Sequence, residues 1–546
     1  MRLWITLFFL QFAPSLFSFE PSILEEMTLE EKVGQILMVH FQGSCVNEEA
    51  KLLIQKTHIG SIIYYNWSNE LSSPFQVKKL SEDLQQIAHT TRLSIPLLIA
   101  IDQEGGLVTR LSEGFTLFPG NKALGMTGNP SLAWESAYCM GREMQEVGIN
   151  LVLGPVVDIN THPTNPVIGL RSFGSTPFEV ISYGKKALKG FHQAGLATCL
   201  KHYPGHGSVT VDSHYDLPFT DKSLKELQEE ELSPFTHLAH KTDAIMTAHI
   251  LHLALDDARC ATLSPKALRY LRDELHFKGT IITDSLAMQG VLKQCEGDVI
   301  KASIQAINAG CDLLCLGGRH LAQGTIQGST HFETLKIIHE ELVQAVEQGQ
   351  ISEDRLNEAV ANVLSLKKKC LFLKEAAREK PPLDFNNLQK HQKVARKISA
   401  KALKIVKDNP ILLKDLSQKN IAFIAPLSLE KSLVKEPFSH LGKSAKLLFF
   451  SQDSLDSNIE ILINEIEASD TLVIFSVGAW KNLEQKRVID QIIDLHKHTI
   501  LVVTKEPLDV ELFPQADITL CTFSPSSPSL HAVYSYLKNN SGETAP

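Results

Sequence analysis

The chain has 546 residues, 43% of them hydrophobic, and a formal net charge of −9. This length exceeds what one compact core usually supports, so two domains are the default expectation. The composition is that of a soluble globular protein, and its dispersed lysines and arginines form no basic stripe, which excludes the usual nucleic-acid-binding modules and leaves no nucleic-acid partner expected.

The N-terminus has the pattern of an export signal. Residues 1–18 combine one basic residue, Arg2, with an apolar run over residues 3–10 and a small residue, Ser18, at the expected cleavage point. The run is too short for a comfortable transmembrane helix and Pro14 would disrupt one, so no stable membrane insertion is expected. We therefore predict an exported protein, periplasmic or extracellular; the alternative is a cytoplasmic protein with an apolar N-terminal arm.

Nine cysteines complicate that prediction. Their odd number and lack of tight spacing argue against a disulfide framework. Several lie in apolar strand-like runs, where a free cysteine usually behaves as a small buried hydrophobe. Cys311 and Cys315 do not form a CxxC pair, so a zinc or redox site is weakly supported. Structural thiols are the favoured interpretation, and no metal or other cofactor is expected.

From residue 28 the sequence alternates short apolar runs with longer amphipathic segments. Thr28 and Glu31 form a capping-box pattern that predicts the start of a first helix. Helix-like segments follow, such as 131–147, 177–194 and 263–275. The expected strands are Gln35–His40, Ile59–Tyr65, Ile95–Asp102, Ile149–Asp158, Leu196–His202, Ala244–His249, Thr280–Asp284 and Cys311–Leu316.

Eight apolar strands separated by helices imply parallel strands with crossover connections. We predict a (β/α)₈ TIM-type barrel over residues 19–375, with an open doubly wound sheet as the alternative. Polar residues favour the barrel, because a closed barrel gathers the carboxyl ends of all its strands at one mouth. The residues at expected strand ends are Asp102, Asp158, Lys201 with His202, His249 and Asp284.

The sequence changes character after about residue 370. A charged stretch that includes Lys367–Lys369 and ends in Pro381-Pro382 predicts a linker, placed at residues 376–390. Residues 391–546 then predict a smaller C-terminal α/β domain, which begins with a helix over 392–406. Its expected strands are 421–425, 446–450, 471–477, 499–503 and 518–521. Because this part has no glycine-rich phosphate loop, a scaffolding or site-covering role is favoured over independent catalysis.

The run Lys201–Gly207 (KHYPGHG) is the densest group of reactive residues in the chain. Its two histidines, four residues apart, could suggest a metal site on a helix, but the proline and glycines make a helix there improbable. The run predicts a reactive loop, and its glycines suggest mobility over a bound substrate. Asp212 lies two residues before His214, an arrangement that can orient and charge-stabilise a general acid/base imidazole.

Three further positions could carry chemistry. Asp284 ends an expected strand and could be a nucleophile, a metal ligand or a helix N-cap. Asp102, with Glu104 and Arg110, offers acceptors and a forked donor to a polar ligand, although the glycines nearby could simply form a turn. Arg171 lies in an apolar, glycine-flanked setting that favours a buried clamp over a surface arginine. Together these groups suit a neutral, hydroxyl-rich molecule such as a sugar.

The motifs KHYPGHG and DSH, with IDQEGG before them and ITDSLAM after them, closely resemble glycoside hydrolase family 3, in its bacterial β-N-acetylglucosaminidase branch. The resemblance covers most of residues 28–370, and the C-terminal domain resembles the second domain of longer members more loosely. One departure is Leu107, which stands where this branch often has arginine. The DSH element separates this branch from the β-glucosidases, whose acid/base is a glutamate elsewhere.

The resemblance implies a role for each site residue. Asp284 matches the catalytic nucleophile, and His214 matches the general acid/base, assisted by Asp212. Five residues match those that hold the terminal N-acetylglucosamine: Asp102, Arg110, Arg171, Lys201 and His202. His206 is expected to be structural.

These roles predict a retaining exo-β-N-acetylglucosaminidase that acts on peptidoglycan or muropeptide fragments through a glycosyl-enzyme. One alternative is a transferase or phosphorylase that uses the same intermediate. The other is a non-catalytic glycan-binding protein. The sequence leaves the oligomeric state open.

Overall fold

The computed structural model describes residues 21–319, 331–451, 459–495 and 498–541. The predicted export signal, residues 1–18, lies outside this part of the chain. Among the described residues, none of the helices combines the length and apolar character needed to span a bilayer.

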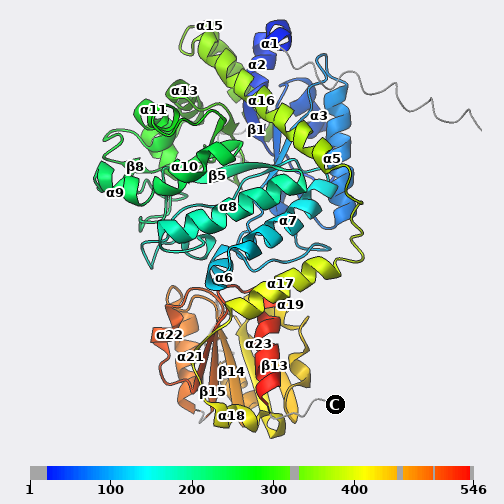
Figure 1. Ribbon diagram of the computed structural model, residues 1–546, viewed down its shortest axis with the longest axis vertical. Coiled ribbons are helices and arrows are strands. Elements are labelled where there is room, and N and C mark those ends of the chain that lie inside the picture. Colours follow the sequence, from blue (N-terminus) through cyan, green and yellow to red (C-terminus); the bar gives the residue numbers. More distant parts are fainter. Residues whose placement is uncertain (1–20, 320–330, 452–458, 496–497, 542–546) are drawn as a thin grey trace, which may run out of the picture.

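The first domain is a parallel β-barrel (Figure 1). Its strands follow one another around the barrel in chain order, and β10 pairs with β1. A parallel bridge between Ile282 and Leu313 joins β9 to the segment that leads into β10 and completes the ring. The predicted (β/α)₈ barrel is thus confirmed over an open sheet. The strands are β1 (Leu37–Val39), β2 (Ser61–Tyr64), β3 (Leu98–Ile101), β4 (Leu151–Val152), β5 (Ala197–Tyr203), β7 (Ala244–Thr247), β9 (Thr280–Thr283) and β10 (Leu314–Cys315).

Helices surround this barrel. The predicted capping box is present: the Thr28 hydroxyl accepts from the Glu31 N–H, and the Glu31 carboxylate accepts from the Thr28 N–H at 2.9 Å. The helices are α1 (Pro21–Glu26), α2 (Leu29–Gln35), α3 (Glu48–Gln55), α4 (Asn66–Asn69), α5 (Pro74–His89), α6 (Asn121–Met126), α7 (Ser131–Glu146), α8 (Pro177–Ala194), α9 (Leu224–Glu229), α10 (Ser233–Leu238), α11 (Pro265–Asp273), α12 (Gln289–Leu292), α13 (Val299–Ala309), α15 (His331–Glu347) and α16 (Glu353–Ala377). The loops contain a short 3₁₀ turn, η1 (Gly169–Arg171). They also contain a two-stranded ribbon of β6 (Phe219–Thr220) and β8 (Leu251–His252).

The second domain is a six-stranded α/β sheet with the order β11-β16-β15-β14-β12-β13. Five strands are parallel, in the doubly wound arrangement, and β11 adds an antiparallel edge. Separate hydrophobic clusters cover its two faces. Its elements are α17 (Gln389–Ala402), β11 (Lys404–Lys407), α18 (Pro410–Lys414), β12 (Asn420–Pro426), α19 (Glu430–Leu433), β13 (Ser444–Phe450), α20 (Ile459–Ile466), β14 (Thr471–Ser476), α21 (Leu483–Leu495), β15 (Thr499–Val503), α22 (Asp509–Leu512), β16 (Ile518–Cys521) and α23 (Ser527–Asn540).

Two local predictions in this region are wrong. Lys367–Lys369 belong to the middle of α16 rather than to a linker. Lys367 is buried, and its ammonium donates to the Gln35 side chain at 2.7 Å, because one residue of the charged run falls on the inward face of the helix. Residues 404–407, expected as the end of a helix, form β11 instead, since the free edge of β16 offers backbone partners there.

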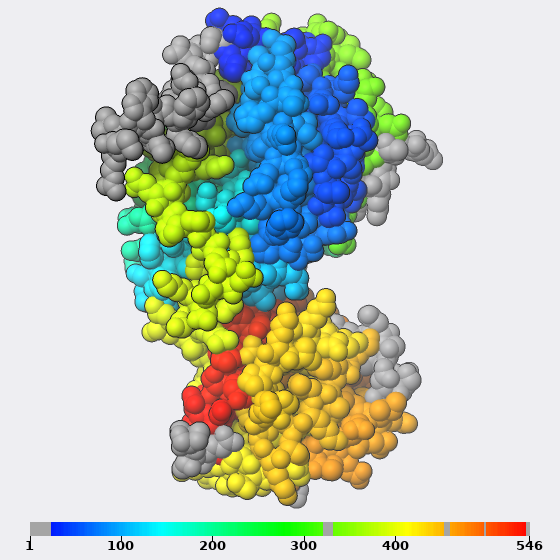
Figure 2. Space-filling view, turned by 90° about the vertical axis from the view of Figure 1, so that its right-hand side faces the viewer, coloured from blue at the N-terminus to red at the C-terminus, as the bar shows by residue number. Residues whose placement is uncertain are grey.

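Helix α17 joins the two domains. Its residues Ala395 and Ile398 belong to the hydrophobic core of the barrel, whereas Ala402 belongs to that of the second domain. His391, near its start, pairs with Glu143 of α7 at 2.6 Å. Figure 2 shows the two lobes in contact at a narrower waist, with the chain descending from one to the other along one side. The stretch without helix or strand between the domains is therefore limited to residues 378–388.

Candidate active site

The polar strand ends gather around one cavity of about 160 Å³ at the mouth of the barrel. Seven of the eight predicted site residues line it, and the eighth, Asp212, lies behind His214. The seven are Asp102, Arg110, Arg171, Lys201, His202, His214 and Asp284. The barrel thus brings together residues that are up to 182 positions apart in the sequence.

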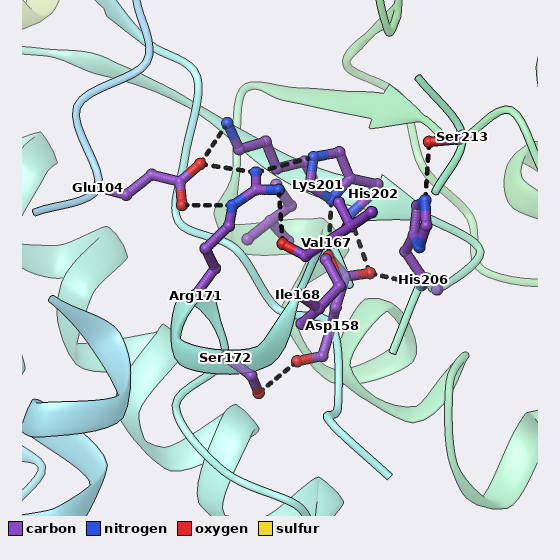
Figure 3. Close-up of polar contacts among 12 residues, drawn as sticks. Glu104, Asp158, Val167, Ile168, Arg171, Ser172, Lys201, His202, His206 and Ser213 are labelled. Carbon is purple, nitrogen blue, oxygen red and sulfur yellow. Dashed lines mark hydrogen bonds and ion pairs between the residues drawn. The ribbon is translucent and has the colours of Figure 1, made fainter. Parts of the chain in front are cut away.

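A buried ion cluster forms one wall of the cavity (Figure 3). The Lys201 ammonium, on β5, lies 2.6 Å from an Asp102 oxygen and 2.8 Å from a Glu104 oxygen. Burial lowers the pKa of Lys201, but the two carboxylates outweigh burial and raise it. Lysine is therefore held charged inside the barrel, where an unpaired ammonium would be costly.

Arg171 reaches this cluster from η1. Its guanidinium binds the Glu104 carboxylate with two hydrogen bonds, at 2.9 and 3.0 Å, and lies 3.3 Å from Nε2 of His202. Burial raises the pKa of Glu104, yet Arg171 and Lys201 together hold it well below its usual range. Arg171 is thus partly buried and held by Glu104 rather than free on the surface, and its guanidinium is oriented before any ligand binds. Arg110 approaches Asp102 more loosely, at 3.8 Å.

A second chain of contacts starts at His202. Its Nδ1 lies 2.7 Å from Asp158, and the backbone N–H of His206 donates to the same carboxylate at 2.7 Å. Nε2 of His206 is 2.9 Å from the Ser213 hydroxyl, and both side chains are buried (Figure 3). Burial lowers the pKa of His206 to about 4, so this imidazole is neutral near pH 7. His206 therefore ties the ligand-facing end of β5 to the loop of Asp212 and His214.

Asp284 follows β9 directly and faces the cavity. Burial raises the pKa of its carboxyl, but three imidazoles and one backbone N–H outweigh burial and lower it to about 2. The carboxylate is therefore ionised at neutral pH without a salt bridge to arginine or lysine in the described part of the chain. The groups that lower the pKa belong to His202, His249, His214 and Ser285.

The predicted Asp-His pair has the expected geometry. One Asp212 oxygen accepts both from Nδ1 of His214, at 2.7 Å, and from the His214 backbone N–H, at 2.9 Å. The hydrogen bond to Asp212 raises the pKa of His214, partial burial opposes this, and Asp284 adds to the rise. The His214 side chain is 56% exposed, so it can exchange protons with solvent while it faces the cavity.

This loop is anchored to the segment that follows Asp284. The backbone N–H of Gly290 donates to the Ser213 carbonyl at 3.0 Å, and Lys293 pairs with Asp216 at 2.5 Å. A Cβ on Gly290 would lie 2.8 Å from the Ser213 oxygen, so only glycine lets the two segments come this close. The Asp212–His214 pair and Asp284 thus share one hydrogen-bonded framework.

The glycines around His206 have a different role from the mobility suggested by the sequence. A Cβ on Gly207 would lie 1.7 Å from the Ile159 carbonyl oxygen, and a Cβ on Gly205 would lie 2.6 Å from Cβ of Glu231. Both glycines therefore allow close packing of the loop against neighbouring backbone and side chains.

We expect Gly207→Ala to lower the free energy of unfolding by about 1–3 kcal/mol, as overpacking usually does. It should also lower kcat/KM in an assay of the activity predicted from the sequence, because the Ile159 clash displaces the loop that carries His206. Denaturant unfolding and steady-state kinetics measure the two effects. Gly128→Ala is the control, since among the described residues no atom beyond its two chain neighbours lies within 4 Å of its Cβ position and only its φ of +63° is strained. Full activity in folded Gly207→Ala protein would contradict this role.

Two acidic residues named in the sequence analysis hold other site residues. Glu104 holds both Lys201 and Arg171, and Asp158 holds both His202 and His206. Glu104 comes three residues after the end of β3, and Asp158 comes six residues after the end of β4, so both lie in the loops at the mouth of the barrel. Metal binding by the histidines has no structural counterpart: within residues 21–319 and the other described segments, no group of three or more His, Cys, Asp or Glu side chains is placed to hold a metal ion. The nine cysteines are all free, and only Cys45 is exposed.

Comparison with known proteins places this geometry in a family. The model of the glycosyl hydrolase family 3 N-terminal domain matches residues 28–366, more than half of the chain. This chain belongs to glycosyl hydrolase family 3. A solved family 3 β-N-acetylglucosaminidase from Paenibacillus sp. is 30% identical, with a TM-score of 0.81, over 95% of this chain and 98% of that one.

Curated relatives of this family 3 chain point the same way. Beta-hexosaminidase A of Pseudoalteromonas piscicida is 32% identical over 63% of this chain and 61% of its own length. The beta-hexosaminidase of Idiomarina loihiensis is 34% identical over 51% of this chain and 82% of its own length. The chain thus spans about three fifths of the first relative, whereas the match to the second covers most of that shorter protein.

Proposed function

We propose that this chain is a retaining exo-β-N-acetylglucosaminidase. The observation that carries the proposal is the pairing of an ionised, partly buried Asp284 carboxylate with the Asp212–His214 pair at the same small cavity. A nucleophile and a proton carrier on one cavity are what glycoside hydrolysis with retention requires. The names of the relatives, β-hexosaminidase and β-N-acetylglucosaminidase, support the amino sugar as substrate.

The proposed first step forms a glycosyl-enzyme. Protonated His214 donates its proton to the glycosidic oxygen while an Asp284 oxygen bonds to the anomeric carbon, and the aglycone leaves as an alcohol. Asp212 makes His214 a competent acid by raising its pKa. In the second step neutral His214 takes a proton from water, and the resulting hydroxyl displaces Asp284 from the anomeric carbon. Two inversions give net retention.

The remaining polar wall is proposed to bind one terminal sugar. A cavity of about 160 Å³ is smaller than the roughly 300 Å³ or more of drug-sized sites, which favours a single ring and hence exo cleavage. Lysine and arginine donors fixed by carboxylates can then contact hydroxyl groups without reorganising. The residues assigned to this wall are Asp102, Arg110, Arg171, Lys201 and His202.

The mechanism predicts a β-configured sugar as the first product. When wild-type protein hydrolyses an aryl β-N-acetylglucosaminide, proton NMR within the first minutes should show the β-anomer, which later mutarotates. A fluorosugar inactivator should label the peptide that carries Asp284, read by mass spectrometry. An α-anomer as first product would contradict the proposal. Binding without either turnover or labelling would favour a glycan-binding protein.

The natural substrate is proposed to be peptidoglycan or its muropeptide fragments, and the export pattern at residues 1–18 suggests action outside the cytoplasm. A phosphorylase would use the same glycosyl-enzyme but intercept it with phosphate. Product analysis in phosphate buffer separates these alternatives: free N-acetylglucosamine supports hydrolysis, whereas the sugar 1-phosphate supports phosphorolysis.

A further inference from the structure

The side chain next to the sugar clamp belongs to the core of the other domain. Leu170, in η1, is 6% exposed and lies in a hydrophobic cluster built otherwise almost entirely from residues 402–523. Besides Leu170, the barrel contributes Ala123 to that core, with Met126 packed against it. Leu170 immediately precedes Arg171, whose fork lies on the cavity wall. A three-residue turn therefore connects the second domain's core to the candidate active site.

Contacts around the turn make this connection short and stiff. A Cβ placed on Gly169 would lie 3.1 Å from a Glu506 carboxylate oxygen, so the loop after β15 packs directly on the turn. On the other side, the Asn121 amide donates to the Arg171 carbonyl at 2.7 Å, and α6, which begins with Asn121, packs against α17. In Figure 1, α6 lies at the end of the barrel that meets the second domain.

The turn is also held within the barrel, because the Arg171 N–H donates to the Ile168 carbonyl at 2.7 Å and the Ser172 hydroxyl donates to the Asp158 carbonyl at 2.7 Å (Figure 3). Leu170 is the side chain of the turn that reaches the core of the second domain. The guanidinium binds the side chains of Glu104 and His202 and the Val167 carbonyl, four residues back on the same loop. We propose that the second domain is a working part of the sugar site: it holds Leu170 and thereby sets the position of the Arg171 clamp. Leu170 is thus a positioning residue. This inference rests on the proposed function of Arg171 in binding the terminal sugar.

The proposal predicts a selective effect of Leu170→Ala. Removing the side chain frees the turn, so Arg171 should bind the sugar more weakly in both the ground state and the transition state. That raises KM for an aryl β-N-acetylglucosaminide by about tenfold while kcat stays nearly constant. Leu170→Met, which keeps the apolar volume, should restore KM. Leu170→Val provides a milder cavity if the alanine variant does not fold.

The matched control is Leu412→Ala. Leu412 is 7% exposed, and it lies in the cluster on the opposite face of the second domain's sheet, in α18 at the end of that domain remote from the barrel (Figure 1). This change should destabilise the second domain comparably and leave KM unaltered. Equal KM increases in both variants would show that general loosening of the domain is responsible and would overturn the proposal.

A double variant tests whether Leu170 acts through Arg171. If it does, Leu170→Ala should add nothing to the KM of Arg171→Ala, whereas independent effects would multiply. Multiplicative effects, or an unchanged KM in folded Leu170→Ala, would overturn the inference while leaving the activity intact. An unchanged KM in Arg171→Ala would instead refute the role assigned to Arg171 under the proposed function.

Discussion

Asp284→Asn is expected to abolish turnover, lowering kcat by about 10⁴–10⁶-fold, the range found when a catalytic nucleophile is removed. Asparagine keeps the size of the side chain. The Ser285 N–H, which donates to the carboxylate at 2.7 Å, can donate to the amide oxygen instead. The fold should therefore persist. What is lost is the negative charge that must bond to the anomeric carbon, so substrate binding should survive and the chemical step should not.

The measurement is single-turnover hydrolysis of an aryl β-N-acetylglucosaminide, with binding of the free sugar followed separately. Asp298→Asn provides the control, because Asp298 is the exposed N-cap of α13 and asparagine caps helices equally well. Asp284→Asn protein with a kcat within tenfold of wild type would exclude Asp284 as the nucleophile.

His214→Gln should lower kcat/KM by about 10²–10⁴-fold, the usual contribution of a general acid/base. The loss should be smaller for aryl leaving groups of low pKa, because they depart without full protonation. His237→Gln is a matched control on α10, away from the cavity, where the imidazole lies 2.8 Å from the Ser233 carbonyl. A loss that is the same for all leaving groups would argue against proton donation by His214.

The pH dependence follows from the same pair. In the free enzyme the first step needs His214 protonated, so kcat/KM should fall as pH rises through its pKa. Asp212 raises that pKa, and Asp212→Asn should therefore move the basic limb to lower pH. The acidic limb reflects Asp284, with a pKa of about 2, and should not move. Asp216→Asn, on the same loop but paired with Lys293, should leave the whole profile unchanged.

The barrel and most of its site could be predicted from the sequence, because both follow from local patterns. Each apolar run is long enough to identify a strand, and a polar residue at its carboxyl end must face the mouth once the barrel closes. Asp102, Lys201 and Asp284 were found in this way. Glu104 and Asp158 lie further past the ends of β3 and β4 and hold other site residues, a role that only the assembled geometry distinguishes from ligand binding.

Other features depend on contacts between distant segments. Three consecutive lysines indicate a solvated surface, but Lys367 lies on the inward face of its helix and is buried. Residues 404–407 have no local signal for an antiparallel edge beyond Ile405 and Val406, and the partner strand lies more than one hundred residues later. Likewise, the glycines beside His206 carry no sign in the sequence of the Ile159 carbonyl that excludes a side chain.

Helix α17 bears on how the molecule comes apart. One helix supplies Ala395 and Ile398 to one core and Ala402 to the other, so unfolding of either core exposes apolar surface of the other core to water. Leu170 makes the same link in the opposite direction. The two lobes should therefore lose their structure together in a single cooperative transition, rather than as separate units joined by a tether.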